Sequence, residues 1–335
     1  MLRLLPHLLY QRVSILSCAL AAPRTFLGMS TVSPPPLPSA PAACAQPSSG
    51  TAHHHQGDNG GRHRAVVPRV LQVVPGSGPF GEQVNDAKFY TLGEHPASLT
   101  LGPAAGPAAT RADIDVGPGG LAFVIRDILS AEEADALVAV SEAMGYSRYA
   151  PMLRTAPGMR QNSAAHWFAP AATARLFLEP LFGRFKHLLP AEMDGAPLHP
   201  RLSHRLAHYK YDSGDVFNVH TDGSWPGQQV NARGDGISEW PGVASQLSML
   251  LYLSDEGDGV RGGHTRLYKA DYSRPRGGRA LPGEDEGVDV APRKGSALFF
   301  RHGFGHDSVL HAGRPVGDGA PKYIARLNVL YGPGN

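Results

Sequence analysis

Cysteine is the rarest residue type in this 335-residue sequence, which contains only Cys18 and Cys44. The chain beyond Cys44 therefore has no thiolate to offer a metal ion and cannot form a disulfide. A metal site there would have to consist of histidine and carboxylate ligands. The absence also favours a reducing compartment, because secreted domains often use disulfides.

Acidic residues are absent from the first part of the chain, where Asp58 is the first. Residues 1–30 are apolar with scattered arginines, a composition typical of an organelle transit peptide, and we expect import into a mitochondrion or plastid. The alternative is a secretory signal with "VSILSCALAA" as its apolar part, leading to the secretory pathway and endoplasmic reticulum. A stable membrane span is not expected, because Pro6 and Arg12 interrupt the apolar residues and no run of about 18 remains.

Net charge is also scarce: the whole chain carries +2. Residues 1–65 hold five of the 31 basic residues and one of the 29 acidic ones, so the remainder has 26 basic and 28 acidic residues. Such a balance is poorly suited to binding nucleic-acid phosphates, so no nucleic-acid partner is expected.

Glycine and proline, in contrast, are abundant, with 40 and 30 residues. The Pro-, Ser- and Gly-rich residues 31–65 are typical of a disordered low-complexity linker. Residues 66–118 form an N-terminal extension of uncertain structure that includes one strand-like run, "AVVPRVLQVV". Regular patterns begin near residue 119, so 119–335 is expected to be one domain.

Two helices are expected early in this domain. Ser130 and Glu133 form a capping box before an apolar-periodic segment that ends at Gly145. A second helix is expected over 172–189, interrupted near Pro180. From about residue 200 to 335, short apolar runs alternate with Gly, Asp, Ser and Pro turns. The fold class is therefore mainly β (α+β): a jelly-roll, or double-stranded β-helix, core with N-terminal flanking helices.

The segment "YDSGDVFNVHTDGSW" carries the first chemical signal. His220 and Asp222 are two residues apart, so on a strand they project from one face. One more histidine would complete the two-His, one-carboxylate set of non-haem Fe(II) oxygenases. The downstream candidates for that third ligand are His264, His302, His306 and His311.

The order of the surrounding motifs resembles the prolyl 4-hydroxylase-like group of 2-oxoglutarate/Fe(II) dioxygenases over roughly residues 120–335. A tyrosine, a glycine and an aromatic precede the His-x-Asp pair, here Tyr211, Gly214 and Phe217. Then follow "LLYLSDEGDGVRGGHT", "VAPRKGSALFF" and "LHAGRPVGDGAPKYIARLNVLY". The resemblance implies that His220, Asp222 and His311 are the iron ligands, with His306 as the runner-up for the last. It leaves His302 and His306 as loop residues or neighbours of the ligands, and His264 as an exposed turn residue.

The resemblance also implies a cation that binds the distal carboxylate of 2-oxoglutarate. Lys322 follows His311 by eleven residues, one more than is usual in the family, and Arg326 shares its strand face. Lys322 is preferred because "KYIAR" keeps the family's order. Tyr211 and Tyr252 are implied to contact the co-substrate through their hydroxyls, although Tyr252 fits a buried core aromatic equally well.

The implied activity is hydroxylation of an unactivated C–H bond with Fe(II), 2-oxoglutarate and O2, and with ascorbate as reductant. The expected substrate is a peptidyl proline; the alternatives are the same chemistry on a small molecule or free amino acid, or a non-catalytic jelly-roll binding module. Loops after Asp222 ("GSWPGQQVNARGDGISEWPGVAS") and at 270–287 are candidates for a lid. Arg160, in an Arg-x-Asn pattern, is a candidate for the substrate mouth.

Overall fold

The computed structural model describes residues 67–74, 86–102, 108–148, 158–275, 283 and 286–334. The expected targeting peptide (1–30), the linker (31–65) and the middle of the 270–287 loop lie outside these residues. All of the described residues belong to one compact unit, Gly61–Asn335.

Strands dominate the described chain, as the sequence indicated. In the first half they are β1 (Pro68–Val74), β2 (Ala87–Leu92), β3 (Thr110–Asp113), β4 (Ala122–Arg126), β5 (Ser147–Arg148), β6 (Ser163–Phe168), β7 (Glu192–Met193) and β8 (Ala196–Pro197). In the second half they are β9 (Arg205–Tyr211), β10 (Phe217–His220), β11 (Pro226–Val230), β12 (Ile237–Tyr252), β13 (Thr265–Tyr268), β14 (Gly287–Val290), β15 (Ala297–Arg301), β16 (His311–Gly313) and β17 (Lys322–Tyr331).

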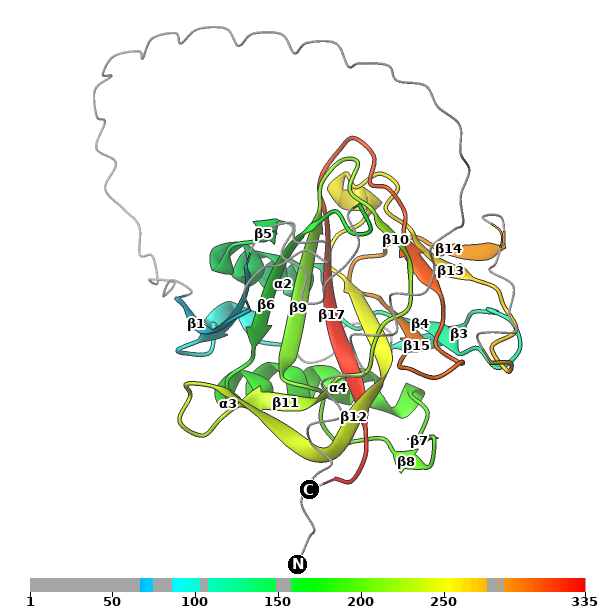
Figure 1. The fold of residues 1–335 in the computed structure, drawn as a ribbon. Helices are drawn as coiled ribbons and strands as arrows, with labels where there is room; N and C mark the ends of the chain where they lie inside the picture. The colour runs from blue at the N-terminus through cyan, green and yellow to red at the C-terminus, as the bar shows by residue number, and fades with distance from the viewer. Residues whose placement is uncertain are drawn as a thin grey trace, which may run out of the picture. The chain divides into compact units, whose positions relative to one another are not determined.

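Two sheets carry the fold. The larger has the order β1-β2-β6-β9-β17-β12-β15-β4-β3, with β11 paired to β12 and β5 to β6 (Figure 1). The smaller has the order β10-β16-β13-β14, and β7 and β8 pair separately. Several neighbours in both sheets are far apart in sequence, and almost all pairs are antiparallel, as in a jelly roll. The expected jelly-roll core is confirmed.

Helix α2 (Ala131–Met144) begins and ends at local capping residues, and α4 (Glu179–Phe185) follows later in the chain. Ser130 accepts a hydrogen bond from the Glu133 N–H and the Glu133 side chain accepts one from the Ser130 N–H, so the expected capping box is present and Gly145 is the C-cap. The segment expected as one interrupted helix is divided more finely. It runs α3 (Ala171–Thr173), a π-helical turn η2 (Ala174–Leu178), α4 and a 3₁₀ turn η3 (Lys186–Leu188). A further 3₁₀ turn, η1 (Ala97–Leu99), lies before β3 and another, η4 (Glu256–Asp258), after β12.

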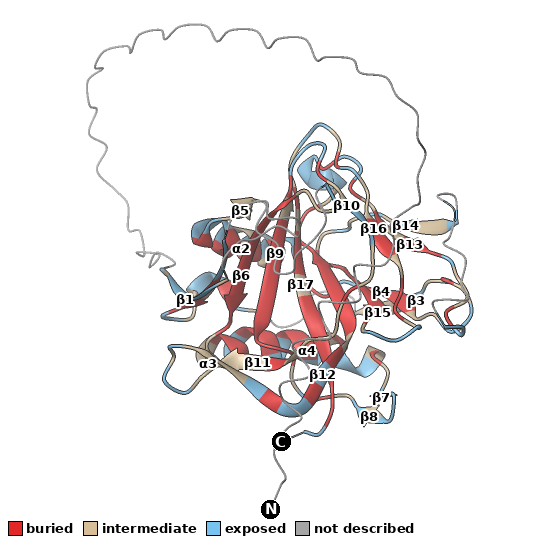
Figure 2. Cartoon of the chain, in the orientation of Figure 1, coloured by how far each residue is buried: buried red, intermediate tan, exposed pale blue. Residues whose placement is uncertain are grey.

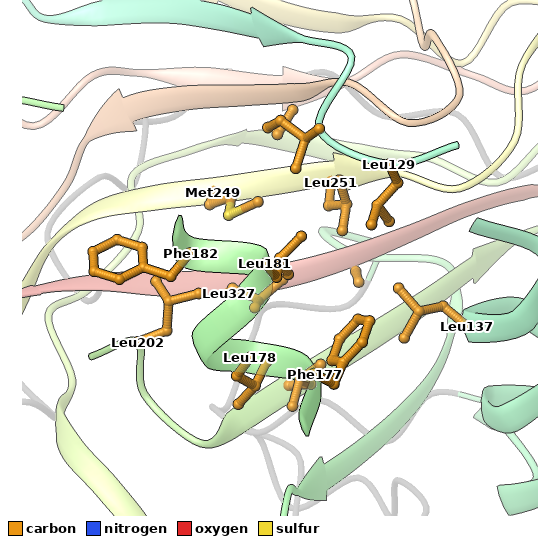
Figure 3. Packing of buried hydrophobic residues seen from close by; sticks show 14 of the residues in the cluster. Leu129, Leu137, Phe177, Leu178, Leu181, Phe182, Leu202, Met249, Leu251 and Leu327 are labelled. Carbon is orange, nitrogen blue, oxygen red and sulfur yellow. The ribbon is translucent and has the colours of Figure 1, made fainter. Parts of the chain in front are cut away.

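These helices cover one face of the larger sheet. Leu181 of α4 and Leu137 of α2 belong to one buried cluster with Met249, Leu251 and Leu327 from β12 and β17 (Figure 3). Each of these five side chains is at most 1% exposed. Truncating one of the leucines to alanine would cost roughly 2–5 kcal/mol, which makes this face the rigid support of the fold.

The opposite face of the same strands carries the functional residues. Along β17 the side chains alternate, so Ala325 and Leu327 join the helix-covered cluster, whereas Ile324 belongs to a second cluster that includes Leu267 of the smaller sheet. Lys322, Arg326 and Asn328 are separated from Ile324 by even numbers of residues, so their side chains project to the same face of β17. The central strands β6, β9 and β17 are buried along most of their length (Figure 2), so polar residues on this inner face lie away from solvent.

The insertion after Asp222 is not an irregular loop over the site. It forms a hairpin in which β11 pairs with the long strand β12 and extends the larger sheet. Trp240 at its end is buried, with its ring stacked on His199 and the Arg201 guanidinium 4.4 Å from the ring centroid. The insertion expected as a lid loop is therefore an ordered hairpin that its own packing holds in place. No helix in the described part of the chain is both long and apolar enough to cross a membrane.

Candidate metal centre and co-substrate pocket

Pairing between two strands of the smaller sheet brings together two histidines that are distant in sequence. β10 and β16 are antiparallel, and His220 stands directly opposite His311 in their register. The two ring centroids are 4.1 Å apart. A directly opposed pair of this kind projects both side chains to one face.

Asp222 completes a three-residue cluster just beyond the end of β10. One carboxylate oxygen lies 3.8 Å from His220 Nε2 and the other lies 3.8 Å from His311 Nε2. The three potential ligand atoms all lie within 4.8 Å of one another, and this is the one such group of three among the described residues. Two imidazole nitrogens and one carboxylate on one side of an ion leave the other side open for exogenous ligands.

Hydrogen bonds fix which nitrogen each histidine presents. Nδ1 of His220 lies 2.7 Å from the Asn218 carbonyl oxygen, and Nδ1 of His311 lies 3.1 Å from that of Val309. A carbonyl oxygen only accepts, so each Nδ1 carries the proton and each Nε2 offers its lone pair. Burial also lowers the pKa of both imidazoles, which keeps them in the neutral form that binds a metal.

A directional hydrogen-bond chain holds the Asp222 carboxylate. Ser248 Oγ donates to Asp222 Oδ2 at 2.6 Å and lies 2.8 Å from His302 Nδ1. Because the one Ser248 proton goes to the carboxylate, His302 Nδ1–H donates to Ser248, and the Ser245 hydroxyl donates to His302 Nε2 at 2.8 Å. The Trp225 N–H in turn donates to Ser245 Oγ. Burial, followed by Arg326, lowers the pKa of His302 to about 3, which agrees with the neutral ring this chain needs.

Arg326 approaches the same carboxylate from β17. Its Nη2 lies 3.3 Å from Asp222 Oδ2. Burial by itself would raise the pKa of Asp222, but Arg326 and the neighbouring imidazoles hold it well below its usual range. The Asp222 carboxylate therefore stays ionised over the whole physiological pH range and could bind a cation.

The other histidines considered from the sequence lie elsewhere. His306 is exposed, so it does not compete with His311 for the cluster. His302 is buried behind Asp222 in the hydrogen-bond chain, and His264 is half-buried in its turn. His208 is fully buried on the helix-covered side of β9, beside Trp167. Sequence reasoning missed Ser245 and Ser248, whose only signal is a pair of hydroxyls inside the apolar run "SQLSMLLY".

Lys322 is a buried cation on the same face. It is opposite Tyr211 in the pairing of β17 with β9, and its Nζ lies 5.4 Å from the Tyr211 ring centroid and 5.7 Å from that of Tyr252. The ammonium donates to the Gly263 carbonyl at 2.5 Å, and no carboxylate of the described residues pairs with it. Burial lowers its pKa to about 8. A buried lysine without an acidic partner is prepared for an exogenous carboxylate.

The two tyrosines form the walls beside this ammonium. Tyr252 donates its hydroxyl proton to Thr265 Oγ1 at 3.0 Å, so the hydroxyl oxygen can still accept a hydrogen bond. Burial raises the pKa of Tyr211 to about 12 and also raises that of Tyr252, so both stay protonated. Of the sequence candidates, Lys322, Tyr211 and Tyr252 thus lie together, while Arg326 lies beside Asp222.

The donor set, the buried cation and the jelly roll together define a class: metal-dependent oxidoreductases that bind a carboxylate co-substrate beside the ion. Residues 205–330 match the family model of the 2OG-Fe(II) oxygenase superfamily. Residues 205–330 therefore carry a 2OG-Fe(II) oxygenase domain, whose chemistry is that of an oxidoreductase. This agrees with the resemblance found in the sequence, and such a domain uses Fe(II) and 2-oxoglutarate.

Solved structures similar to this chain include several hydroxylases. A viral collagen prolyl hydroxylase from Paramecium Bursaria Chlorella virus-1 in complex with 2OG is 17% identical, with a TM-score of 0.37 over 69% of this chain and 99% of that one. A Trichoplax adhaerens prolyl hydroxylase in complex with a hypoxia inducible factor peptide fragment is 15% identical, with a TM-score of 0.40 over 63% and 83%. HygX from Streptomyces hygroscopicus, with nickel and 2-oxoglutarate bound, is 15% identical, with a TM-score of 0.37 over 64% and 83%. No curated protein matches.

Proposed function

We propose that this protein hydroxylates an unactivated C–H bond of a peptidyl substrate, with proline as the target residue. The observation that carries the hydroxylase proposal is a cluster of two histidines and Asp222 beside a buried, acid-free lysine. In the overall reaction, O2 supplies one oxygen atom to the substrate C–H and one to succinate, while 2-oxoglutarate loses CO2 and the two electrons that the reaction requires.

In this proposal the chain's own residues bind and orient. His220, Asp222 and His311 would hold Fe(II), which supplies the redox chemistry when bound. Lys322 would pair with the distal carboxylate of 2-oxoglutarate, and the rings of Tyr211 and Tyr252 would exclude water from that pair. Ascorbate would restore the reduced iron.

An exposed aromatic side chain near the cluster supports a peptide as substrate. Phe304 is 60% exposed. Phe304 lies over Gly223, where its ring is 3.7 Å from the position that a Cβ would take. A peptide that covers this side chain would remove apolar surface from water as it presents its proline.

Two measurements test the proposal. Succinate formation from 2-oxoglutarate with added Fe(II) tests the chemistry, and a peptide library screened by mass spectrometry for one added oxygen tests the substrate. Iron binding with succinate release, plus one added oxygen on proline peptides, is the expected result. Neither iron binding nor succinate would favour a non-catalytic binding module instead. Succinate with products only from free amino acids or other small molecules would favour the alternative substrates.

The compartment is a separate proposal that rests on the composition of residues 1–30. We propose import into a mitochondrion or plastid. Fusing residues 1–65 to a fluorescent protein should direct it to that organelle, whereas a fusion found in the endoplasmic reticulum would support the secretory alternative.

A further inference from the structure

Three arginines surround the inner face of the site next to the iron ligands. Arg326 on β17 contacts Asp222. Arg205 on β9 is 5% exposed and lies against Trp225, with its Cζ 3.8 Å from the ring centroid. Arg160, before β6, lies between the rings of Tyr209 and Phe217, with its Cζ 4.2 Å and 4.6 Å from their centroids. We call these three residues the arginine cluster.

Several donors of the arginine cluster have no hydrogen-bond partner among the described residues. They are the buried side-chain nitrogens Arg160 Nη2, Arg205 Nε and Arg326 Nε, while Arg326 Nη2 makes no hydrogen bond but lies 3.3 Å from Asp222 Oδ2. Next to them, Asn328 Oδ1 and both ring nitrogens of His166 are also buried and unpartnered. Native proteins leave few buried polar groups unpaired, because each costs about 1–3 kcal/mol. Several such groups around one point indicate a partner that the described residues do not supply.

A small cavity lies at this point. It is lined by Arg205, Ala207, Arg326 and Asn328 and has a volume of about 10 Å³. That volume admits one oxygen atom. An oxygen placed there would lie within the reach of two guanidinium groups, which prefer carboxylate-like partners in a planar, two-bond geometry.

The charge balance of the site also favours a bound anion at the arginine cluster. The two negative charges of 2-oxoglutarate would balance the charge of Lys322 and one of the two positive charges of Fe(II). The Asp222 carboxylate would balance the second positive charge of Fe(II). The arginine cluster is then left with no counter-charge, since Asp222 is the only carboxylate of the described residues paired with any member. Three uncompensated cations at this depth are costly unless a bound anion joins them.

We propose that the arginine cluster binds a carboxylate of the primary substrate and so selects acidic substrates. The inference rests on the proposed hydroxylase function and names the substrate class of the same site: for a peptide, an aspartate or glutamate near the oxidised proline. Arg326 contacts both Asp222 and the cavity, so the bound carboxylate would hold the neighbouring C–H beside the iron. An extended polyanion is disfavoured, because the cluster is buried and the chain after residue 65 has more acidic than basic residues.

Matched acid and amide substrates test this selection. Two proline-peptide libraries, one with Asp and Glu at the variable positions and one with Asn and Gln, are incubated with the full-length protein, Fe(II) and 2-oxoglutarate. A paired set of free amino acids and their amides is treated in the same way. The expected result is that acidic members gain one oxygen with a kcat/KM about 30-fold or more above that of their amides. Equal use of both members of each pair would overturn the proposal.

Variants separate this proposal from the hydroxylase function. Arg205→Met should raise the KM for an acidic substrate about 30-fold or more and abolish the preference over its amide, and Arg205→Lys should restore part of both. Arg201→Met is the matched control, because Arg201 lies on Trp240 outside the cluster, and it should keep the preference. Thermal unfolding of the iron-free Arg205→Met protein checks that it folds.

Each failure has its own signature. If Arg205→Met raised the KM for 2-oxoglutarate instead, the cluster would serve the co-substrate and the proposal would be wrong. Wild-type protein that forms succinate but shows no preference for acids would overturn the inference alone. Wild-type protein that binds no iron and forms no succinate would overturn the hydroxylase function itself.

Discussion

Replacing Lys322 with methionine should separate the two effects of its buried charge. Methionine is similar in length and fills the space between Tyr211 and Tyr252 without the ammonium group. The substitution should weaken 2-oxoglutarate binding strongly. It should also leave the iron-free, co-substrate-free protein as stable as the wild type, or more stable.

The magnitudes follow from burial. An exposed lysine has a pKa of about 10.4 and burial lowers that of Lys322 to about 8, so the charged form costs about 3 kcal/mol in the folded protein. Methionine removes that cost and loses one hydrogen bond to Gly263, worth about 1–3 kcal/mol when a charge is involved. The stability change is therefore between zero and about +2 kcal/mol. Loss of a buried charge pair with the co-substrate costs about 2–5 kcal/mol, which raises the KM for 2-oxoglutarate at least about 30-fold.

The assays are urea unfolding of the metal-free protein and succinate formation against 2-oxoglutarate concentration. Lys322→Arg is the matched control, because it keeps a cation and should keep most of the affinity. Arg326→Met is the comparison variant for the residue that shares the strand face. Should Arg326→Met raise the KM for 2-oxoglutarate more than Lys322→Met does, Arg326 would be the anchor. A Lys322→Met protein destabilised by several kcal/mol would show that the ammonium is paired in the resting protein.

Four further outcomes are expected. Asp222→Ala should abolish iron binding in an anaerobic titration, whereas His306→Ala, at an exposed position, should retain it. The reverse result would contradict the proposed set of three iron ligands. Ser248→Ala removes the 2.6 Å hydrogen bond to the ligand carboxylate and should weaken iron binding roughly 10–100-fold in the same titration. The KM for 2-oxoglutarate should rise about tenfold per pH unit above about pH 8, because Lys322 of the co-substrate-free protein loses its proton there and only the protonated form pairs with a carboxylate. A KM that stays constant from pH 8 to 10 in the wild type would contradict this. The Lys322→Arg variant should show such a constant KM. Ser130→Ala should lower the free energy of unfolding by about 1 kcal/mol in urea, and no change would mean that the capping box is not formed in solution.

Local signals made part of this structure predictable. The capping box at Ser130 and the glycine at 145 depend on neighbours within a few residues, so the sequence alone locates helix α2. The His220-x-Asp222 spacing is similarly local, and the strand period places both residues on one face. The choice of His311 needed the order of the downstream motifs, and the cross-strand register of β10 with β16 is what brings it opposite His220.

Features made by distant strands could not be predicted in this way. Ser248 and His302 meet because β12 pairs with β15, across more than fifty residues of sequence. The insertion after Asp222 has the glycine and proline content of a loop, yet Trp240 fixes it as a hairpin by packing on His199. In both cases the partner that decides the structure lies far along the chain, where no short pattern identifies it.

One strand, β17, connects the co-substrate to the proposed substrate. Lys322 and Arg326 lie four residues apart on the same face, which corresponds to about 13 Å along a strand. Arg326 stands beside Asp222, whereas Lys322 lies farther along the same strand face. A carboxylate at Arg326 and Arg205 would then be on the far side of the iron ligands from the 2-oxoglutarate anchor. Strand β17 would thus position both reactants, with Arg205 of the paired strand β9 joining Arg326 at the substrate carboxylate. This is why loss of Lys322 and loss of Arg205 should affect different Michaelis constants.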